Sequence, residues 1–308
     1  MKTAFLFSGQ GAQYPSMMKD ISCWSIAAKE VFDVADRTLN RSISSLCFEG
    51  TQEELNLTHN TQPCVLAADL AAYAAIIETG IEPDAVAGFS LGEYAGLVAA
   101  NAIRIENVFP LIQQRADFMQ EAVPVGLGAM AAIMKLTNDE VISLCSEVNG
   151  YVISANYNCP GQIVVSGEAE AIDKVLEIAK ERKIRAIKLS VSAPFHCDMM
   201  SPAAERLRVP IHNTHISTPT IPIYMNVDAK PELDIQKIKE KLIAQAKSPV
   251  LWEQTLINMF NDGITTFIEL GPGKTLSGFV KKTLGDKVES YHITDISTLQ
   301  ETENALRK

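Results

Sequence analysis

The sequence of 308 residues predicts an α/β fold, in which helices cover both faces of a parallel sheet and a small domain is inserted. Three observations predict it. Short apolar runs, such as residues 4–7 and 85–87, are typical of buried parallel strands. Helical patterns alternate with these runs, which favours strands joined by crossover helices. From residue 128 the order becomes β-α-β-β-α-β, as in a ferredoxin-like unit.

The first part of the chain is expected to begin with the strand at residues 4–7 and to continue its sheet at residues 85–87. Four helical patterns accompany these strands, at residues 24–39, 63–79, 93–100 and 105–121. The second pattern follows Thr61, whose hydroxyl is expected to cap that helix.

A ferredoxin-like domain is expected at residues 125–194, inserted into a larger domain of residues 1–124 and 195–308. The elements of the insert are predicted at residues 129–134, 138–149, 151–156, 162–166, 168–182 and 184–189. The later elements of the larger domain are predicted at residues 199–206, 220–225, 235–246, 252–262 and 266–270. Beyond residue 286 the sequence carries little signal.

Composition and charge restrict the class of protein. The formal net charge of −10 argues against nucleic acid as a partner. No apolar run could span a bilayer and no signal peptide is recognisable, so we expect a soluble cytoplasmic protein that does not bind membranes. The six cysteines form no CxxC pair and the five histidines no ligand pattern, so no metal site is expected. His212 and His215 are expected in a surface loop.

The segment Gly88-Phe89-Ser90-Leu91-Gly92 is the strongest chemical signal in the chain. It lies between a predicted strand and a predicted helix. Two glycines allow a sharp turn there, and the turn exposes the Ser90 hydroxyl beside a helix N-terminus, as in α/β-hydrolase-like folds. The pattern therefore predicts an α/β-hydrolase-like large domain with Ser90 as a nucleophile; the alternative is a plain turn between strand and helix.

A serine nucleophile needs a base and an oxyanion hole. His196 is the best candidate for the base, because it lies where the insert rejoins the larger domain and a cleft is expected. The alternative is a packed or capping histidine. The N–H of Leu91 is the usual first donor in such a turn, and the Gly-flanked Gln10 fits the second.

Three segments resemble the signatures of malonyl-CoA:acyl carrier protein transacylases: FSGQGAQ at residues 7–13, GFSLGEY at 88–94 and GPGK at 271–274. Further matches follow in the family's order, at residues 61–63, 114–115, 118–122, 156–158, 160–162 and 195–197. The resemblance covers nearly the whole chain, from residue 5 to about 282.

The resemblance implies a role for each candidate residue. Ser90 would carry the acyl group and His196 would be its base, oriented by main-chain carbonyls. Gln245 aligns with the residue that supplies one of these carbonyls. Gln10 and the Leu91 amide would form the oxyanion hole.

Arg115 would bind the malonyl carboxylate, since a planar guanidinium can hold a carboxylate through two parallel hydrogen bonds. It lies on an otherwise apolar helix, where its charge needs a partner or a cleft. Phe195 resembles the malonyl-selective form, in which a bulky ring excludes an α-methyl group. The other expected pocket residues are Gln62, Phe89, Met119 and Asn156.

Two positions depart from the family's usual pattern. Ser8 stands where a proline is most usual, and Phe89 stands where a histidine is most usual. Both are interpreted as tolerated, and Phe89 is expected to affect the pocket wall or the leakage to hydrolysis.

The implied reaction is a ping-pong transfer from malonyl-CoA to the phosphopantetheine thiol of acyl carrier protein, supplying fatty-acid synthesis. Coenzyme A is a substrate in it, no cofactor is needed, and a monomer is expected. Three alternatives stay open: a trans-acting acyltransferase of a polyketide synthase, a related acyl hydrolase, and a non-catalytic binding domain. An acidic carrier needs a basic patch on this acidic protein, and two clusters are candidates. They are Lys274, Lys281 and Lys282, or Arg182, Lys183 and Arg185.

Overall fold

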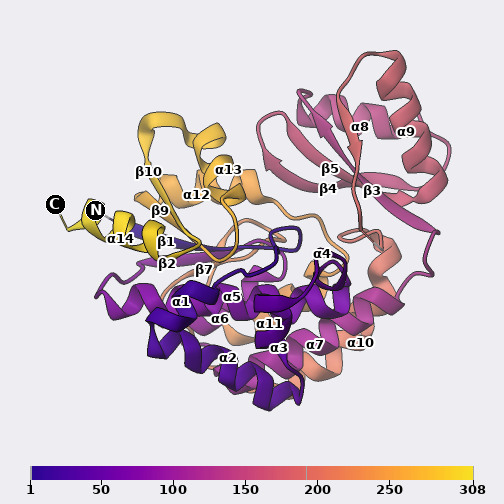
Figure 1. Ribbon diagram of the computed structural model, residues 1–308. Helices are drawn as coiled ribbons and strands as arrows, with labels where there is room; N and C mark the ends of the chain where they lie inside the picture. Colours follow the sequence, from indigo (N-terminus) through magenta and orange to yellow (C-terminus); the bar gives the residue numbers. More distant parts are fainter. Residues whose placement is uncertain (1, 192, 308) are drawn as a thin grey trace.

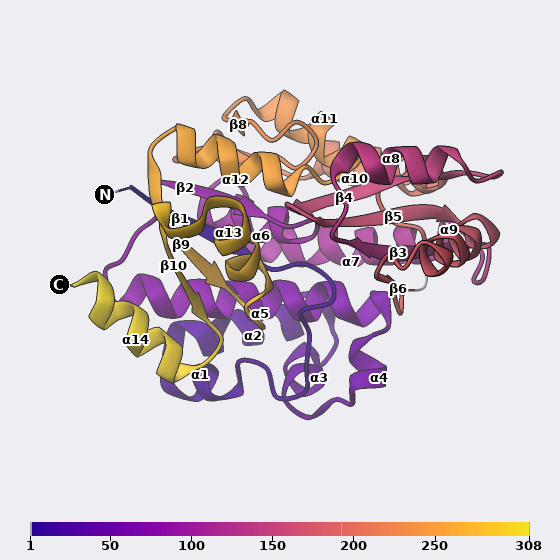
Figure 2. The ribbon, with the colours of Figure 1, turned by 90° about the horizontal axis from the view of Figure 1, so that it is seen from above.

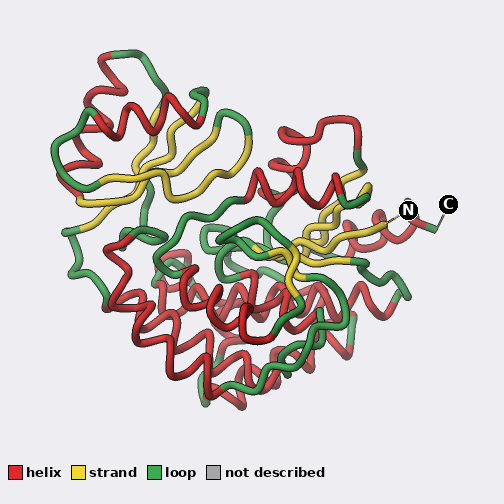
Figure 3. The backbone as a smooth tube through the Cα atoms, turned by 180° about the vertical axis from the view of Figure 1, so that it is seen from behind, coloured by secondary structure: helices red, strands yellow, loops and turns green. Residues whose placement is uncertain are grey.

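Two separate sheets organise the computed structural model, which describes residues 2–191 and 193–307 (Figure 1). The larger sheet has six strands and the smaller has four. Viewed from behind, the strands form two distinct groups (Figure 3). Together they confirm the predicted fold class, a mostly parallel α/β sheet accompanied by a separate antiparallel one.

The larger sheet places several strand ends at one edge. In spatial order its strands are β10 (Glu289–Ile293), β9 (Ile264–Leu270), β1 (Lys2–Phe7), β2 (Ala85–Gly88), β7 (Ile223–Tyr224) and β8 (Pro231–Glu232). All neighbours are parallel except β7 and β8. Phe7 pairs with both Gly88 and Leu270, so β1, β2 and β9 end together. In α/β sheets this carboxyl edge carries the site.

Helices cover both faces of the larger sheet (Figure 2). The helices of this larger part are α1 (Lys19–Trp24), α2 (Ile26–Leu39), α3 (Ile43–Glu49), α4 (Gln52–Leu55), α5 (Thr58–Glu78), α6 (Gly92–Ala99), α7 (Ile105–Glu121), α10 (Ser201–Asn213), α11 (Ile235–Gln245), α12 (Trp252–Asn261), α13 (Thr275–Leu284) and α14 (Ile296–Leu306). Short 3₁₀ turns lie at Asp198–Met200 and Gly285–Lys287.

The alternation of side chains along β1 explains the two covered faces. Phe5 and Phe7 belong to a core shared with α2 and α5, whereas Ala4 and Leu6 belong to a core shared with α12 and α13. Both sets are fully buried, as expected for a strand of a parallel sheet. The central helix α5 is apolar almost all round and most of its 21 residues are buried.

The smaller sheet lies within the segment predicted for the insert. Its elements are β3 (Gly128–Met134), α8 (Asn138–Ser146), β4 (Val152–Cys159), β5 (Gln162–Glu168), α9 (Ala169–Glu181) and β6 (Ala186–Lys188). The strands are antiparallel in the order β4-β5-β3-β6, which is the ferredoxin-like arrangement. This part has its own core, which includes Ile133, Ile163 and Val165.

The predicted cap at Thr61 is wrong, because α5 already begins at Thr58. Pro63 lies inside this helix and has no N–H to donate, so the pattern suggested a later start. The side chain of Gln113 donates to the carbonyl of His59 instead. The Thr61 hydroxyl donates to the Leu55 carbonyl.

The surface loop predicted for His212 and His215 is confirmed for His215, which is exposed beyond the helix, and is wrong for His212, because α10 continues past Pro210 to Asn213. Lys239 of α11 donates to the carbonyls of His212 and Thr214, which stabilises the end of the helix. Downstream, the segment with little signal forms β10 and α14. The edge strand β10 is polar, so it lacks the apolar run of a central strand.

Within residues 2–191 and 193–307 no helix has the length and apolar character needed to cross a membrane.

Candidate active site

The turn that carries Ser90 is fixed by close backbone packing. A Cβ on Gly88 would lie 1.9 Å from the carbonyl carbon of Gly92, and a Cβ on Gly92 would lie 2.4 Å from the Phe7 oxygen. Ser90 itself has a φ of 55°, in the left-handed region that few residues other than glycine adopt. The turn therefore holds Ser90 at the wall of a cavity, where the residue is buried rather than exposed as the sequence predicts.

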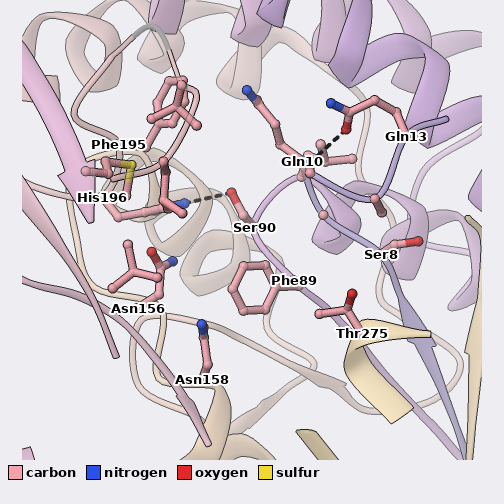
Figure 4. A pocket seen from close by; sticks show the side chains of 18 of the residues that line it. Ser8, Gln10, Gln13, Phe89, Ser90, Asn156, Asn158, Phe195, His196 and Thr275 are labelled. Carbon is pink, nitrogen blue, oxygen red and sulfur yellow. Dashed lines mark hydrogen bonds between the residues drawn. The ribbon is translucent and has the colours of Figure 1, made fainter. Parts of the chain in front are cut away.

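His196 lies against the Ser90 hydroxyl (Figure 4). Its Nε2 is 2.8 Å from Ser90 Oγ, and its Nδ1 is 2.9 Å from the main-chain oxygen of Gln245. A carbonyl oxygen can only accept, so the proton of the neutral ring lies on Nδ1. Nε2 is then free to accept the proton of Ser90. The two residues are 106 positions apart in the chain.

The surroundings of His196 keep the ring neutral. Burial, together with the nearby positive charge of Arg115, lowers its pKa to about 4. Asp198, the only acid close to His196 in the sequence, is exposed, and its N–H donates to the Tyr151 hydroxyl. The ring is thus held by a carbonyl rather than by a carboxylate.

Arg115 projects from α7 to the same hydroxyl. Its Nη2 donates to Ser90 Oγ at 3.0 Å and to Gln245 Oε1 at 2.8 Å, while Nη1 donates to Gln62 Oε1 at 2.6 Å. The side chain is almost fully buried, and burial lowers the pKa of the guanidinium.

The oxygens that accept hydrogen bonds from Arg115 belong to uncharged side chains, and the nearby Glu93 carboxyl, which acts on the guanidinium electrostatically, is not among them. Within residues 2–191 and 193–307 it forms no ion pair, and its Nε has no hydrogen-bond partner. Burying a charge without a counter-charge is costly. The guanidinium can therefore bind an anion that enters beside Ser90.

Two main-chain N–H groups are available near Ser90. Gln10 follows the end of β1 and Leu91 follows Ser90, and both residues line the same cavity. In the described part of the chain, no hydrogen bond uses either N–H. The Gln10 side chain instead points to Thr58, with Nε2 3.2 Å from its hydroxyl oxygen. The arrangement suits an oxyanion hole, in which backbone donors face a developing negative charge.

A cavity of about 440 Å³ connects these groups. Both parts of the molecule line it: Ser90 and Arg115 come from the larger part, and Val164 comes from the smaller. Its wall contains all the further pocket residues expected from the sequence, namely Gln62, Phe89, Met119, Asn156 and Phe195. Gln245 lies behind the wall, where its carbonyl contacts His196.

The sequence reasoning missed four polar contacts behind the turn. Asn226 accepts from the Ser90 N–H at 2.7 Å and donates to the Gly88 oxygen. Glu93 accepts from the Asn226 N–H and from Gln245 Nε2. Burial raises the pKa of Glu93 to about 8, although its hydrogen bonds and Arg115 oppose the rise. Asn226 could have been identified from its position just after β7, because residues at the carboxyl ends of parallel strands often belong to the site.

The described residues contain no cluster of three or more side chains suited to hold a metal ion. The six cysteines are unpaired, and all except Cys23 are buried.

Comparisons with known proteins identify the class. The model of the acyl transferase domain matches residues 4–307. The chain therefore belongs to the acyl transferase domain family. It is 45% identical over 303 residues to the malonyl CoA-acyl carrier protein transacylase of Bacillus subtilis (strain 168), covering 97% of this chain and 95% of that protein.

Solved structures agree with this likeness. The malonyl CoA-acyl carrier protein transacylase from Clostridium perfringens Atcc 13124 superposes with a TM-score of 0.95 at 40% identity, covering 100% of this chain and 98% of the other. A malonyl-transacylase in complex with its type II PKS acyl-carrier protein also reaches a TM-score of 0.95. Its identity is 35%, with 99% and 100% of the two chains covered.

Proposed function

We propose that this protein transfers a malonyl group from malonyl-CoA to the phosphopantetheine thiol of acyl carrier protein, through an ester on Ser90, and so supplies fatty-acid synthesis. One observation carries the proposal: the buried guanidinium of Arg115 lies 3.0 Å from Ser90 Oγ without a carboxylate partner among the described residues. An acyl group that itself bears a carboxylate supplies that partner. The similar transacylases support the same reaction.

The first half-reaction follows from the contacts of Ser90. His196 Nε2 takes the hydroxyl proton while Ser90 Oγ attacks the thioester carbonyl of malonyl-CoA. The N–H groups of Gln10 and Leu91 stabilise the oxyanion of the tetrahedral intermediate. Collapse of this intermediate breaks the C–S bond, and the imidazolium of His196 returns the proton to the departing thiolate of coenzyme A.

The second half-reaction reverses the roles. The malonyl ester stays on Ser90, with its carboxylate on Arg115, until the carrier's thiol enters. His196 accepts the thiol proton, and the thiolate attacks the ester carbonyl. The proton then returns to Ser90 Oγ as the new thioester leaves. Every bond and proton is accounted for, so we propose neither a cofactor nor a metal.

Two aromatic rings shape the acyl site. Phe195, next to His196 in the chain, lines the cavity. Phe89 packs edge-on against Trp252, with 5.4 Å between ring centroids, and contacts Phe279. We propose that these rings select malonyl over branched acyl groups and limit the access of water to the ester.

The proposal is tested by following the label of radioactive malonyl-CoA with and without carrier protein. We expect the label on the protein when carrier is absent and on the carrier when it is present. Release of the label as free malonate under both conditions would instead identify an acyl hydrolase. For neutral acyl groups a hydrolase has no use for the buried charge of Arg115.

The similarity to a malonyl-transacylase bound to a type II PKS acyl-carrier protein keeps a second function open. In that function the protein serves a polyketide synthase with the same chemistry. Supplying a fatty-acid carrier and a polyketide carrier in competition separates the two, and we expect the fatty-acid carrier to receive most of the label.

The pH dependence of ester formation is a further prediction. Only neutral His196 acts as a base, and its pKa is lowered to about 4. We therefore expect kcat/KM for malonyl-CoA to stay constant from pH 8 to below 6, and to fall only as the pH approaches that value. Rapid-quench measurement of the malonyl-enzyme tests this. A midpoint near about 6.5, the pKa of an unperturbed histidine, would contradict it.

The carrier is expected to dock on Lys274, which directly precedes α13, and on Lys281 and Lys282 within α13. Lys274, Lys281 and Lys282 are exposed, and Thr275, Leu276 and Phe279 of the same segment line the cavity. In the described structure none of the three lysines forms an ion pair. By contrast, Arg182 of the second candidate cluster is paired with Glu147. Lys183 and Arg185 of that cluster are exposed too and form no ion pair with any described residue, but only the three lysines belong to a segment that lines the cavity.

Reversing two of these charges should weaken carrier binding. We expect Lys281→Glu together with Lys282→Glu to raise the KM for the carrier by about tenfold, because like charges then repel. The rate of ester formation from malonyl-CoA should stay close to wild type. The matched control is Arg182→Glu with Lys183→Glu on the smaller part. An unchanged carrier KM in the α13 variant would dismiss this patch.

The remaining expectations concern the setting of the protein. We propose that it works as a monomer in the cytoplasm, where coenzyme A thioesters and reduced carrier thiols are present, and without a nucleic-acid partner. Sedimentation of the purified protein tests the first of these expectations.

A further inference from the structure

Ser8, the first residue of the loop that follows β1, forms a buried polar pair with Asp69 of α5. Ser8 Oγ is 2.7 Å from Asp69 Oδ1 and 3.4 Å from the main-chain oxygen of Leu270. The two side chains are 1% and 0% exposed. Figure 4 shows the Ser8 hydroxyl directed away from Ser90, so this pair does not contact the reacting groups.

Asp69 has no other hydrogen-bond partner in the described structure. Its second oxygen, Oδ2, is buried and unpaired. Burial raises the pKa of the Asp69 carboxyl well above its usual range, while the hydrogen bond with Ser8 opposes the rise and Glu269 adds to it. A buried carboxyl with one partner destabilises an apolar helix such as α5. The contacts of Asp69 therefore assign it one structural role, which is to hold the Ser8 hydroxyl.

The loop of Ser8 to Gly11 is packed between this pair and the nucleophile turn. On the turn side, a Cβ on Gly9 would lie 2.8 Å from the ring and from the carbonyl oxygen of Phe89. On the other side, Gly271 has a φ of 118°, and a Cβ there would lie 1.9 Å from Asp69 Oδ1 and 2.4 Å from Ser8 Oγ. The loop therefore cannot move closer to the turn. The Ser8 hydroxyl ties the start of the loop to Asp69, with a longer contact to the Leu270 oxygen, and the Gln10 side chain contacts Thr58.

We propose that Ser8 and Asp69 are positioning residues that hold the loop where the Gln10 N–H reaches the oxyanion formed at Ser90. The inference rests on the proposed function, because it assigns Gln10 to the oxyanion hole. Such donors act only when they are already in place, and a displacement of about 1 Å costs roughly 100-fold in rate. The pair acts on the transition state, since the oxyanion does not yet exist in bound malonyl-CoA.

The test is the rate of malonyl-ester formation in single-turnover experiments on the full chain. Ser8→Ala removes one oxygen atom, and we expect the rate constant to fall by about tenfold. The KM for malonyl-CoA should change less than about twofold, because the ground-state contacts remain. A purely structural serine would lower the melting temperature without this split between rate and KM.

Variants of Asp69 test whether the hydrogen bond is responsible. Asp69→Asn keeps an acceptor oxygen of the same shape, so its rate should stay within about twofold of wild type. Asp69→Leu removes the acceptor and should match Ser8→Ala. The double variant should be no slower than either single variant, because both remove the same contact. The control is Ser22→Ala, a buried serine whose hydroxyl donates to Lys19 at a distance from the cavity.

Two outcomes would overturn the inference: wild-type rates in Ser8→Ala, or an Asp69→Asn rate as low as that of Asp69→Leu. If Asp69→Leu does not fold, Ser8→Ala and Asp69→Asn still decide between these results. A wild-type protein that never forms the malonyl ester would overturn the proposed function instead, which keeps the two failures distinct.

Discussion

Ser90→Ala is expected to abolish the malonyl-enzyme and to lower the transfer rate by about 10⁴-fold or more, as loss of the nucleophile does in serine enzymes. The ester can form only on an oxygen that His196 Nε2 deprotonates, and Ser90 Oγ is the hydroxyl at 2.8 Å from it. Intact-mass spectra after incubation with malonyl-CoA measure the adduct directly. The wild-type protein should gain the mass of one malonyl group, and the variant should not.

Folding of this variant should be preserved. Alanine at position 90 tolerates a φ of 55° as poorly as serine does, so the strain is unchanged. Arg115 Nη2 keeps its hydrogen bond to Gln245 when the hydroxyl is lost. Ser154→Ala, a buried serine of β4 whose hydroxyl is unpaired in the described structure, is the matched control. An adduct that persists on Ser90→Ala would remove Ser90 from the mechanism.

Local patterns predicted the scaffold of the site. Local sequence alone specifies the apolar strands β1 and β2. It also specifies the tight turn, through the glycines on both sides of Ser90. Errors arose where tertiary contacts override local signals. Pro63 lies within α5 because the Gln113 side chain donates to the His59 carbonyl, which the proline leaves without a donor. Helix α10 extends past Pro210 because Lys239 stabilises its C-terminal end.

The polar contacts behind the turn could not be predicted in the same way. Asn226 binds the Ser90 N–H across 136 residues of sequence, and Gln245 reaches the Ser90 carbonyl across 155. Periodicity does not report such pairs, because they depend on how β7 and α11 meet the end of β2. The resemblance to a family supplied the carbonyl of Gln245. It did not supply the side-chain amide, which accepts from Arg115 and donates to Ser90 and Glu93.

Arg115→Ala is expected to lower malonyl transfer by about 10²–10³-fold, because the loss of one partner of a buried charge pair costs about 2–5 kcal/mol. Acetyl transfer should fall much less, because an acetyl group has no carboxylate that binds to Arg115. The acyl preference therefore moves towards acetyl. Competing malonyl-CoA and acetyl-CoA for the protein, with intact-mass detection of each ester, measures this preference in one experiment.

The loss of malonyl transfer depends on the two parallel N–H donors of the Arg115 guanidinium as well as on its charge. Arg115→Lys keeps the positive charge but not the two parallel donors, so its malonyl rate should lie between those of the wild type and Arg115→Ala. Arg104→Ala, an exposed arginine at the start of α7, is the control and should leave the preference unchanged. An unchanged preference in Arg115→Ala would remove Arg115 from the acyl site. The buried charge would then have no assigned anion, and the choice of malonyl-CoA as substrate would lose its physical basis.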